Sequence, residues 1–340
     1  MCGEGESLPQ LIMDVSRSQE EASHLRPLVE RVLKRYPFLT REVEHLVTHS
    51  NVMFRVVTES GEQRCLRIGT PHGNSRSNIE VEVAWLDALH RDSDIEVVRP
   101  IPTVGKKLIV DEYDDRIGKE RSCVLFSWVP GRPMGDGAGP FAYRQLGELC
   151  ALLQTHGRSW VMPPNAVVRR WDRVFYYGAG LDPVVVEDPA YADLFDNERR
   201  ATINRAIAIA DSVIWRSYSG ARPQIVHGDL HEWNVHLAGS RMHVFDFEDV
   251  MMALPAQDVS IALYSSRQSD QRDEIRKAFR RGFEAVSPWP VQDESQLDGF
   301  HAARQIMLMN YAARSLPKSE ADEYLDHVMP WLHGFVARYG

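Results

Sequence analysis

The spacing of hydrophobic and polar positions predicts a first part of the chain that is rich in strands. Leucine, valine and tyrosine recur every three or four positions over residues 24–36, which predicts a helix. Runs rich in β-branched residues follow at 42–49, 51–59 and 63–68, broken by short polar turns, and they predict consecutive antiparallel strands. A helical period and two more strand-like runs complete this part at 78–90, 106–113 and 122–129.

Beyond the segment "VPGRP" at 129–133 the pattern becomes mainly helical, because Pro and Gly interrupt the strands there. Helical periods cover residues 141–157, 197–215, 256–266, 271–286 and 297–314. The exception is a short β-like pair at 224–228 and 241–247. The pattern predicts an α+β protein with a flexible tail at 1–22, a small antiparallel β lobe and hinge at 23–130, and a larger, mainly helical lobe at 131–340.

Composition and charge narrow the class of protein. Hydrophobic residues make up 44% and charged residues 26% of the 340 residues, which is typical of a globular protein. A net charge of -9 is unfavourable for nucleic-acid binding, and no apolar run approaches the roughly 18 residues of a membrane span. The scattered cysteines and the absence of a basic, apolar leader predict a reduced, cytoplasmic protein without nucleic-acid or membrane partners. The oligomeric state is not predicted.

The segment "VHGDLHEWNVHL" at 226–237 carries the chemistry. An Asp on a loop, Asp229, can accept a proton from a hydroxyl, and an Asn five residues later, Asn234, can ligate a divalent cation over phosphate oxygens. Protein kinases use this spacing in their catalytic loop. The following "MHVFDFEDV" supplies a second anionic ligand, Asp246, before Phe247. We therefore predict Asp229 as the catalytic residue and Asn234 and Asp246 as metal ligands.

The two motifs "HGDLHEWN" and "VFDFED" resemble those of the aminoglycoside phosphotransferase and choline kinase superfamily, whose pattern is HGDxxxxN followed by D-F or D-W. "SNVMFRV" and "RCLRI" resemble that family's nucleotide-covering hairpin, and "VPGRP" resembles the stretch after its hinge. The resemblance implies a two-lobed protein-kinase-like fold with ATP and Mg²⁺ between the lobes. GTP in place of ATP remains open.

Strand alternation in "RCLRI" places Cys65 and Arg67 on one face of the predicted sheet. The resemblance implies that Cys65 touches the adenine and that Arg67 reaches the phosphates, where the family has a Lys. On the following helix Glu82 shares the apolar face, whereas Glu80 does not, so Glu82 is the predicted partner of Arg67. The adenine is expected to bind backbone groups near the hinge, at Ser127, Trp128 and Val129.

Three further residues are expected to support the catalytic loop. His227 would orient it, and His231 is expected to approach the transferred phosphoryl group. Asp258 precedes an apolar helical run, so it is either the N-cap of that helix or, as the resemblance implies, a brace for the catalytic loop. Glu248 stands where protein kinases have the Gly of D-F-G, and only twelve positions separate Asp246 from Asp258, which leaves little room for a long activation loop.

The predicted function is ATP-dependent transfer of a phosphoryl group to a hydroxyl of a small molecule, such as an aminoglycoside, an amino alcohol or a homoserine-like compound. A bacterial protein Ser/Thr kinase of the same fold and a nucleotide-binding pseudokinase are the alternatives. A metal-dependent hydrolase is a further alternative, because His227, Asp229 and His231 spell HxDxH. The acidic run at 182–198 is either a wall for a cationic acceptor or a solvated face.

Overall fold

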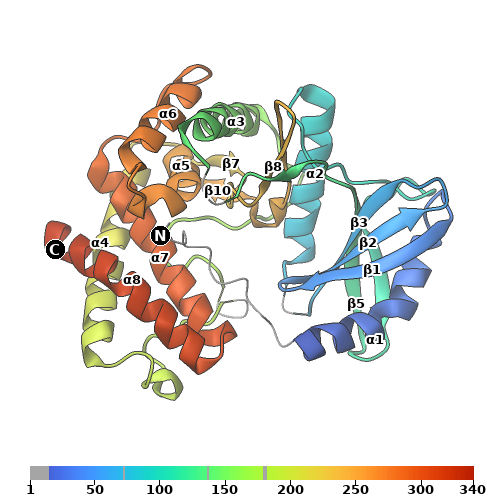
Figure 1. Ribbon diagram of the computed structural model, residues 1–340, viewed down its shortest axis with the longest axis horizontal. Coiled ribbons are helices and arrows are strands. Elements are labelled where there is room, and N and C mark those ends of the chain that lie inside the picture. The colour runs from blue at the N-terminus through green and yellow to red at the C-terminus, as the bar shows by residue number, and fades with distance from the viewer. Residues whose placement is uncertain (1–14, 72, 136–137, 179–181) are drawn as a thin grey trace.

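The structure is a computed structural model that describes residues 15–71, 73–135, 138–178 and 182–340. Its first part contains a five-stranded antiparallel sheet in the order β1-β2-β3-β5-β4, as the strand patterns predict. Figure 1 shows this sheet beside the helical part of the molecule. The strands are β1 (Thr40–Thr48), β2 (Asn51–Thr58), β3 (Gln63–Gly69), β4 (Val110–Asp114) and β5 (Lys119–Ser127).

The two faces of the sheet are covered by different helices. Phe54, Leu66 and Ile68 point to one face and form a core with α1 (Val15–Leu33). Cys65 and Phe126 point to the other face, where they join the large core that includes α2 (Arg76–Asp92) and the helical part. The predicted alternation in β3 is therefore confirmed, and its Cys65 and Arg67 face the rest of the molecule.

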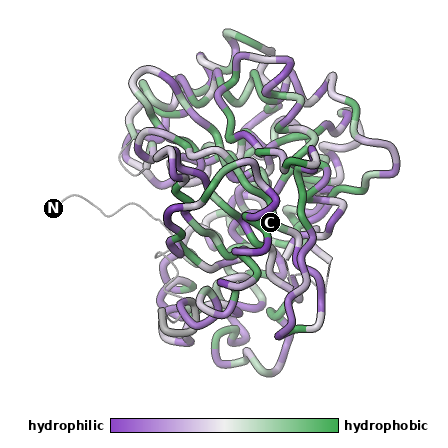
Figure 2. Tube along the Cα trace, turned by 90° about the vertical axis from the view of Figure 1, so that its right-hand side faces the viewer, coloured by the Kyte–Doolittle hydropathy of each residue, from purple (hydrophilic) through white to green (hydrophobic). Residues whose placement is uncertain are grey.

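The helical part packs the six helices α3 to α8 around one continuous core. Figure 2 shows hydrophobic and hydrophilic positions interspersed along the chain. Glycines allow α3 and α6 to approach closely: a Cβ on Gly282 would lie 1.8 Å from a backbone oxygen of α3. The helices are α3 (Pro140–Ser159), α4 (Asn197–Tyr218), α5 (Pro255–Leu263), α6 (Arg272–Glu284), α7 (Glu294–Ser315) and α8 (Lys318–Tyr339).

Short strands in this part position the motif loops. The predicted pairing of 224–228 with 241–247 is wrong, because each segment has a different partner. The observed pairs are β7 (Gln224–Val226) with β10 (Met251–Ala253), and β8 (Val235–Ala238) with β6 (Arg132–Pro133) and β9 (Arg241–Val244). The pairing of β8 with β9 is favoured by their short connection. This connection has two residues, and Gly239 in it adopts the positive φ of 63° that a tight hairpin turn requires. Three 3-10 turns complete the order, η1 (Pro189–Tyr191), η2 (Phe247–Asp249) and η3 (Ser265–Gln268).

The segment predicted to be a flexible tail is in part helical. Helix α1 begins at Val15, so residues 15–22 are helical, and the remainder of the predicted tail lies outside the described residues. Tertiary contacts hold this extra length: Ala22 is buried and Glu21 pairs with Arg121 at 3.3 Å. Within the described ranges, no helix has the length and apolar character needed to cross a membrane.

Candidate active site

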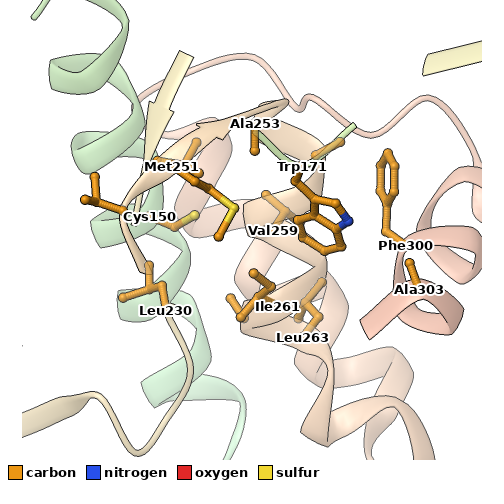
Figure 3. Close-up of a cluster of buried hydrophobic side chains, with 14 of the residues drawn as sticks. Cys150, Trp171, Leu230, Met251, Ala253, Val259, Ile261, Leu263, Phe300 and Ala303 are labelled. Atoms are coloured by element: carbon orange, nitrogen blue, oxygen red, sulfur yellow. The ribbon is translucent and has the colours of Figure 1, made fainter. Parts of the chain in front are cut away.

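The catalytic loop begins with a glycine that the fold requires. Gly228 follows β7 with φ +83°, and a Cβ at this position would lie 2.1 Å from the Asp249 carbonyl oxygen. Its N–H donates to Asp258 Oδ1 at 3.0 Å. Two residues later Leu230 is fully buried and points into the core cluster with Cys150 and Met251 (Figure 3). The loop is therefore fixed on both sides of Asp229.

Asp258 braces this loop from inside a helix. The predicted N-cap role is wrong, because α5 begins at Pro255 and its N-cap position is Leu254. With Pro255 at the first helical position, the helix starts four residues upstream of the start that an Asp258 N-cap implies. Asp258 is fully buried, and burial raises the pKa of its carboxyl to about 6.

His227 orients the loop and is sealed from solvent. Its Nδ1 accepts the Asp229 N–H at 3.2 Å, so the proton lies on Nε2, which donates to the Phe245 carbonyl at 3.1 Å. Burial lowers the pKa of His227 to about 4, so the ring is neutral. Because both nitrogens are used within the protein, His227 is a positioning residue and not one that contacts a substrate.

Asp229 stands at the centre of a small network. Asn234 Nδ2 donates both to the Asp229 carbonyl at 2.9 Å and to Asp229 Oδ2 at 3.0 Å. His231 Nδ1 accepts a backbone N–H, which leaves Nε2 to donate to the same Oδ2 at 3.3 Å. The structure thus places His231 against the carboxylate of Asp229. Its predicted approach to the transferred phosphoryl group stays a prediction.

Arg304 is the site residue that sequence reasoning missed. It extends from α7, and its Nη2 lies 2.6 Å from Asp229 Oδ1. Burial alone raises the pKa of Asp229, but His231 and Arg304 outweigh it and hold the pKa well below its ordinary value. The carboxylate is therefore ionised and oriented at neutral pH. The only sequence signal was a lone Arg in the apolar run "AARQIML".

Asp246 lies beside this network in a left-handed backbone conformation, with φ 61° and ψ 59°. The segments meet where the Phe245 N–H donates to the Asn234 carbonyl at 3.2 Å. Burial by the surrounding protein raises the pKa of Asp246, and the negative charges of Glu248 and Asp229 raise it further. Solvent still reaches the Asp246 side chain. Within the described ranges no residue donates a hydrogen bond to its carboxylate.

These residues fit a divalent cation. Because Asn234 Nδ2 is held by two oxygens of Asp229, the amide must present Oδ1 outward, and no described residue donates to that atom. Asn234 Oδ1 and the Asp246 carboxylate thus form an all-oxygen donor set. Mg²⁺ prefers such a set, completed by substrate phosphates.

The predicted partner of Arg67 is confirmed as Glu82. Arg67 Nη1 donates to Glu82 Oε1 at 2.8 Å, and Nη2 donates to Oε2, so the pair is bidentate. Arg67 is 6% exposed and Glu82 2%, and the guanidinium carbon lies 5.1 Å from the Phe126 ring. The predicted contact between Arg67 and phosphates stays a prediction. Glu80 instead pairs with Arg76 on the exposed face of α2.

The hinge offers fewer groups to an adenine than predicted. The Ser127 N–H donates to the Arg99 carbonyl at 2.8 Å, and Ser127 Oγ accepts from the Arg99 N–H. The backbone N–H of Ser127 is therefore already used within the protein, and the predicted contact of this N–H with an adenine is wrong. No backbone hydrogen bond among the described residues outside the regular elements uses Trp128 or Val129. These two residues and Cys65, which is half-buried on the inner face of the sheet, remain the predicted adenine contacts.

Glu248 joins the turn between β1 and β2 to the segment that carries Asp246. Its carboxylate accepts from Ser50 Oγ at 2.7 Å and from Asn51 Nδ2. Next to it, Asp249 accepts from Arg169 and Tyr177, each at 2.7 Å. Phe247, which lies between Asp246 and Glu248, packs against Trp85 and His227 in the core. The predicted D-F motif therefore connects α2, the catalytic loop and the nucleotide-covering hairpin.

Four carboxylates of the acidic run at 182–198 have partners within the protein. Asp188 and Asp196 cap the starts of η1 and α4. Asp182 pairs with Arg314, and Asp193 with Lys318.

The residues of the HxDxH motif are not arranged as the metal ligands that a metal-dependent hydrolase would need. His227 has no lone pair to offer, and no group of three or more His, Cys, Asp and Glu in the described ranges is arranged to hold a metal.

The architecture and the site together define a two-lobed protein with a kinase-like fold. The chain belongs to the phosphotransferase enzyme family, whose sequence profile matches residues 44–300. It is 29% identical over 238 residues, 68% of its length, to an uncharacterized protein of Synechocystis, and 24% identical over 216 residues, 59% of its length, to hydroxylysine kinase of Bos taurus. The chain spans 62% and 56% of the length of those relatives.

A solved structure confirms the fold. Amicoumacin kinase, in complex with AMP-PNP and Ca²⁺, superposes with a TM-score of 0.71 at 17% identity, covering 94% of this chain and 96% of that one.

Proposed function

We propose that this protein transfers the γ-phosphoryl group of ATP to a hydroxyl group of a small molecule. The observation that carries the proposal is the placement of an ionised Asp229 beside Asn234 Oδ1 and the Asp246 carboxylate. The family supports it, as do the names of the similar proteins, hydroxylysine kinase and amicoumacin kinase.

The residues divide the work of phosphoryl transfer between them. Asp229 orients the acceptor hydroxyl and takes its proton as the bond to phosphorus forms. Arg67 neutralises phosphate charge while Glu82 holds it in place. Asn234 and Asp246 would hold Mg²⁺, which neutralises charge on the phosphate oxygens when it is bound.

The nucleotide would lie between the sheet and the helical part, with its adenine near Trp128, Val129 and Cys65. ATP is the proposed donor, and GTP is the alternative to compare with it. We further propose a cytoplasmic location, which is supported by the free thiols of Cys65, Cys123 and Cys150.

The experiment is a screen of hydroxyl acceptors with ATP and Mg²⁺, read by mass spectrometry as the gain of one phosphate. Asp229→Asn is the control, because it keeps the shape of the side chain and removes the acceptor for the proton. We expect phosphorylation of at least one small molecule by the wild-type protein and a loss of about 10²-fold or more in Asp229→Asn. Nucleotide binding without transfer to any small molecule would contradict the proposal, and transfer only to protein serine or threonine would redirect it.

A further inference from the structure

Arg304 contacts the carboxylate oxygen of Asp229 that Asn234 does not contact. Its Nη2 bonds to Oδ1 at 2.6 Å, whereas Asn234 and His231 bond to the other oxygen, Oδ2. Asn234 is also one of the two residues that the proposed function assigns to the cation. With the cation on the Asn234 side of Asp229, an acceptor would approach from the Arg304 side.

The guanidinium of Arg304 has N–H groups that donate to no described residue. Its Nε is buried and has no partner in the described part of the chain. Its Nη1 makes no hydrogen bond to any described residue and is not sealed from solvent, since the side chain is 18% exposed. The ring of Tyr264, centred 5.6 Å from the guanidinium carbon, holds the group from one side. Arg304 can thus bind a second anion while it holds Asp229.

The surface around Arg304 is better suited to an anion than to a polycation. Arg304, Met307, Tyr311 and Arg314 are half-buried at helical spacing, so they share one partly open face of α7. Of the described carboxylates near this face, Asp229 and Asp249 already have arginine partners, Arg304 and Arg169, and Asp246 is assigned to the cation. Cationic groups of an acceptor would have to compete with these ion pairs.

We propose that Arg304 recognises a carboxylate on the acceptor, so that the substrate class is hydroxy acids or hydroxy amino acids. This inference rests on the proposed function. A guanidinium and a carboxylate match in planar geometry, and the two parallel hydrogen bonds fix orientation as well as distance. Binding of the acceptor carboxylate at Nη1 and Nη2 of Arg304 would place the acceptor hydroxyl near Asp229, because Arg304 is also bonded to Asp229.

The test compares acceptors in matched pairs. Homoserine, threonine and hydroxylysine are each measured against the amino alcohol in which the carboxyl group is replaced by hydrogen. The proteins are the wild type, Arg304→Gln, Arg304→Lys and the control Arg314→Gln. Arg314 lies on the same helix, has the same 18% exposure and also pairs with an aspartate, Asp182. Transfer is read as kcat and KM, and binding is read by calorimetry on the protein loaded with Mg²⁺ and AMP-PNP.

We expect the wild type to prefer the carboxylate member of at least one pair. In Arg304→Gln that preference in kcat/KM should fall about 10- to 100-fold, mainly through KM. Arg304→Lys should keep part of the preference, and Arg314→Gln should keep all of it. An equal loss of kcat for both members of each pair would overturn the proposal, because Arg304 would then act only on Asp229. A change of preference in Arg314→Gln alone would overturn it as well.

The two proposals fail in different ways. Transfer to amino alcohols alone, or no binding of any hydroxy amino acid, would overturn the carboxylate inference. The proposed phosphotransfer stands if transfer to any small-molecule hydroxyl acceptor is observed, in these pairs or in the wider screen. Carboxylate-dependent binding that needs Arg304, without transfer to any acceptor, would support the inference and contradict the proposed function.

Discussion

Removing Glu82 should destabilise the protein far more than removing its neighbour on the same helix, Glu80. Glu82 is 2% exposed and is bonded through both oxygens to Arg67, which is itself 6% exposed. Glu82→Ala leaves a buried guanidinium without its counter-charge, which costs about 3–5 kcal/mol of unfolding free energy. Glu80→Ala breaks only an exposed pair with Arg76 on α2, worth about 0.5 kcal/mol.

The assay is urea unfolding followed by tryptophan fluorescence. Trp85 is a suitable reporter, because it is buried one turn along α2 from Glu82 and packs on Phe247. The double variant Arg67→Met/Glu82→Met should recover most of the lost stability, since it removes both buried charges together. Equal losses in Glu82→Ala and Glu80→Ala, or a double variant as unstable as Glu82→Ala, would refute the reasoning.

Three further results follow from the site. Gly228→Ala should lose at least about 2 kcal/mol of unfolding free energy, because a Cβ there would meet the Asp249 carbonyl at a positive φ; an unchanged melting temperature would contradict this. The pKa of Asp258 is raised from 3.8 to about 6 in the folded state, so its contribution to stability is present at low pH and is lost as the pH rises through about 6. Relative to Asp258→Asn, the wild type should therefore gain about 1.4 kcal/mol between about pH 8 and about pH 5, and a pH-independent difference in urea unfolding would be the opposite outcome. Glu248→Ala should speed hydrogen exchange in the turn at Ser50, which loses its bond to the Glu248 carboxylate, and unchanged exchange there would show that this bond does not hold the turn.

The sequence predicts the parts of the site that are local in the chain. Asp229 and Asn234 lie five positions apart on one loop, and their spacing alone indicates that they meet. Helical periodicity was enough to choose Glu82, because only the apolar face of α2 can turn toward the sheet. These predictions needed no knowledge of the tertiary arrangement.

The parts that depend on distant contacts could not be predicted in this way. Arg304 meets Asp229 across 75 residues, and its place in an apolar run of its helix does not indicate which residue it contacts. The partner of β7 is β10 rather than β9, because the chain folds back after Asp246 in a conformation that Asp seldom adopts. Asp258 looked like an N-cap because its buried contact with Gly228 is also distant in the sequence.

The central claim is a division of labour, in which Asn234 and Asp246 hold the cation on the nucleotide and Asp229 serves the acceptor. Electron paramagnetic resonance of Mn²⁺ in the presence of AMP-PNP measures this directly. We predict that Asn234→Ala and Asp246→Asn each weaken nucleotide-dependent Mn²⁺ binding at least about tenfold, as loss of one of two protein ligands should. Asp229→Asn should bind Mn²⁺ nearly as the wild type does while phosphorylating acceptors at least about 10²-fold more slowly. Full Mn²⁺ affinity in both ligand variants, or its loss in Asp229→Asn alone, would contradict the account.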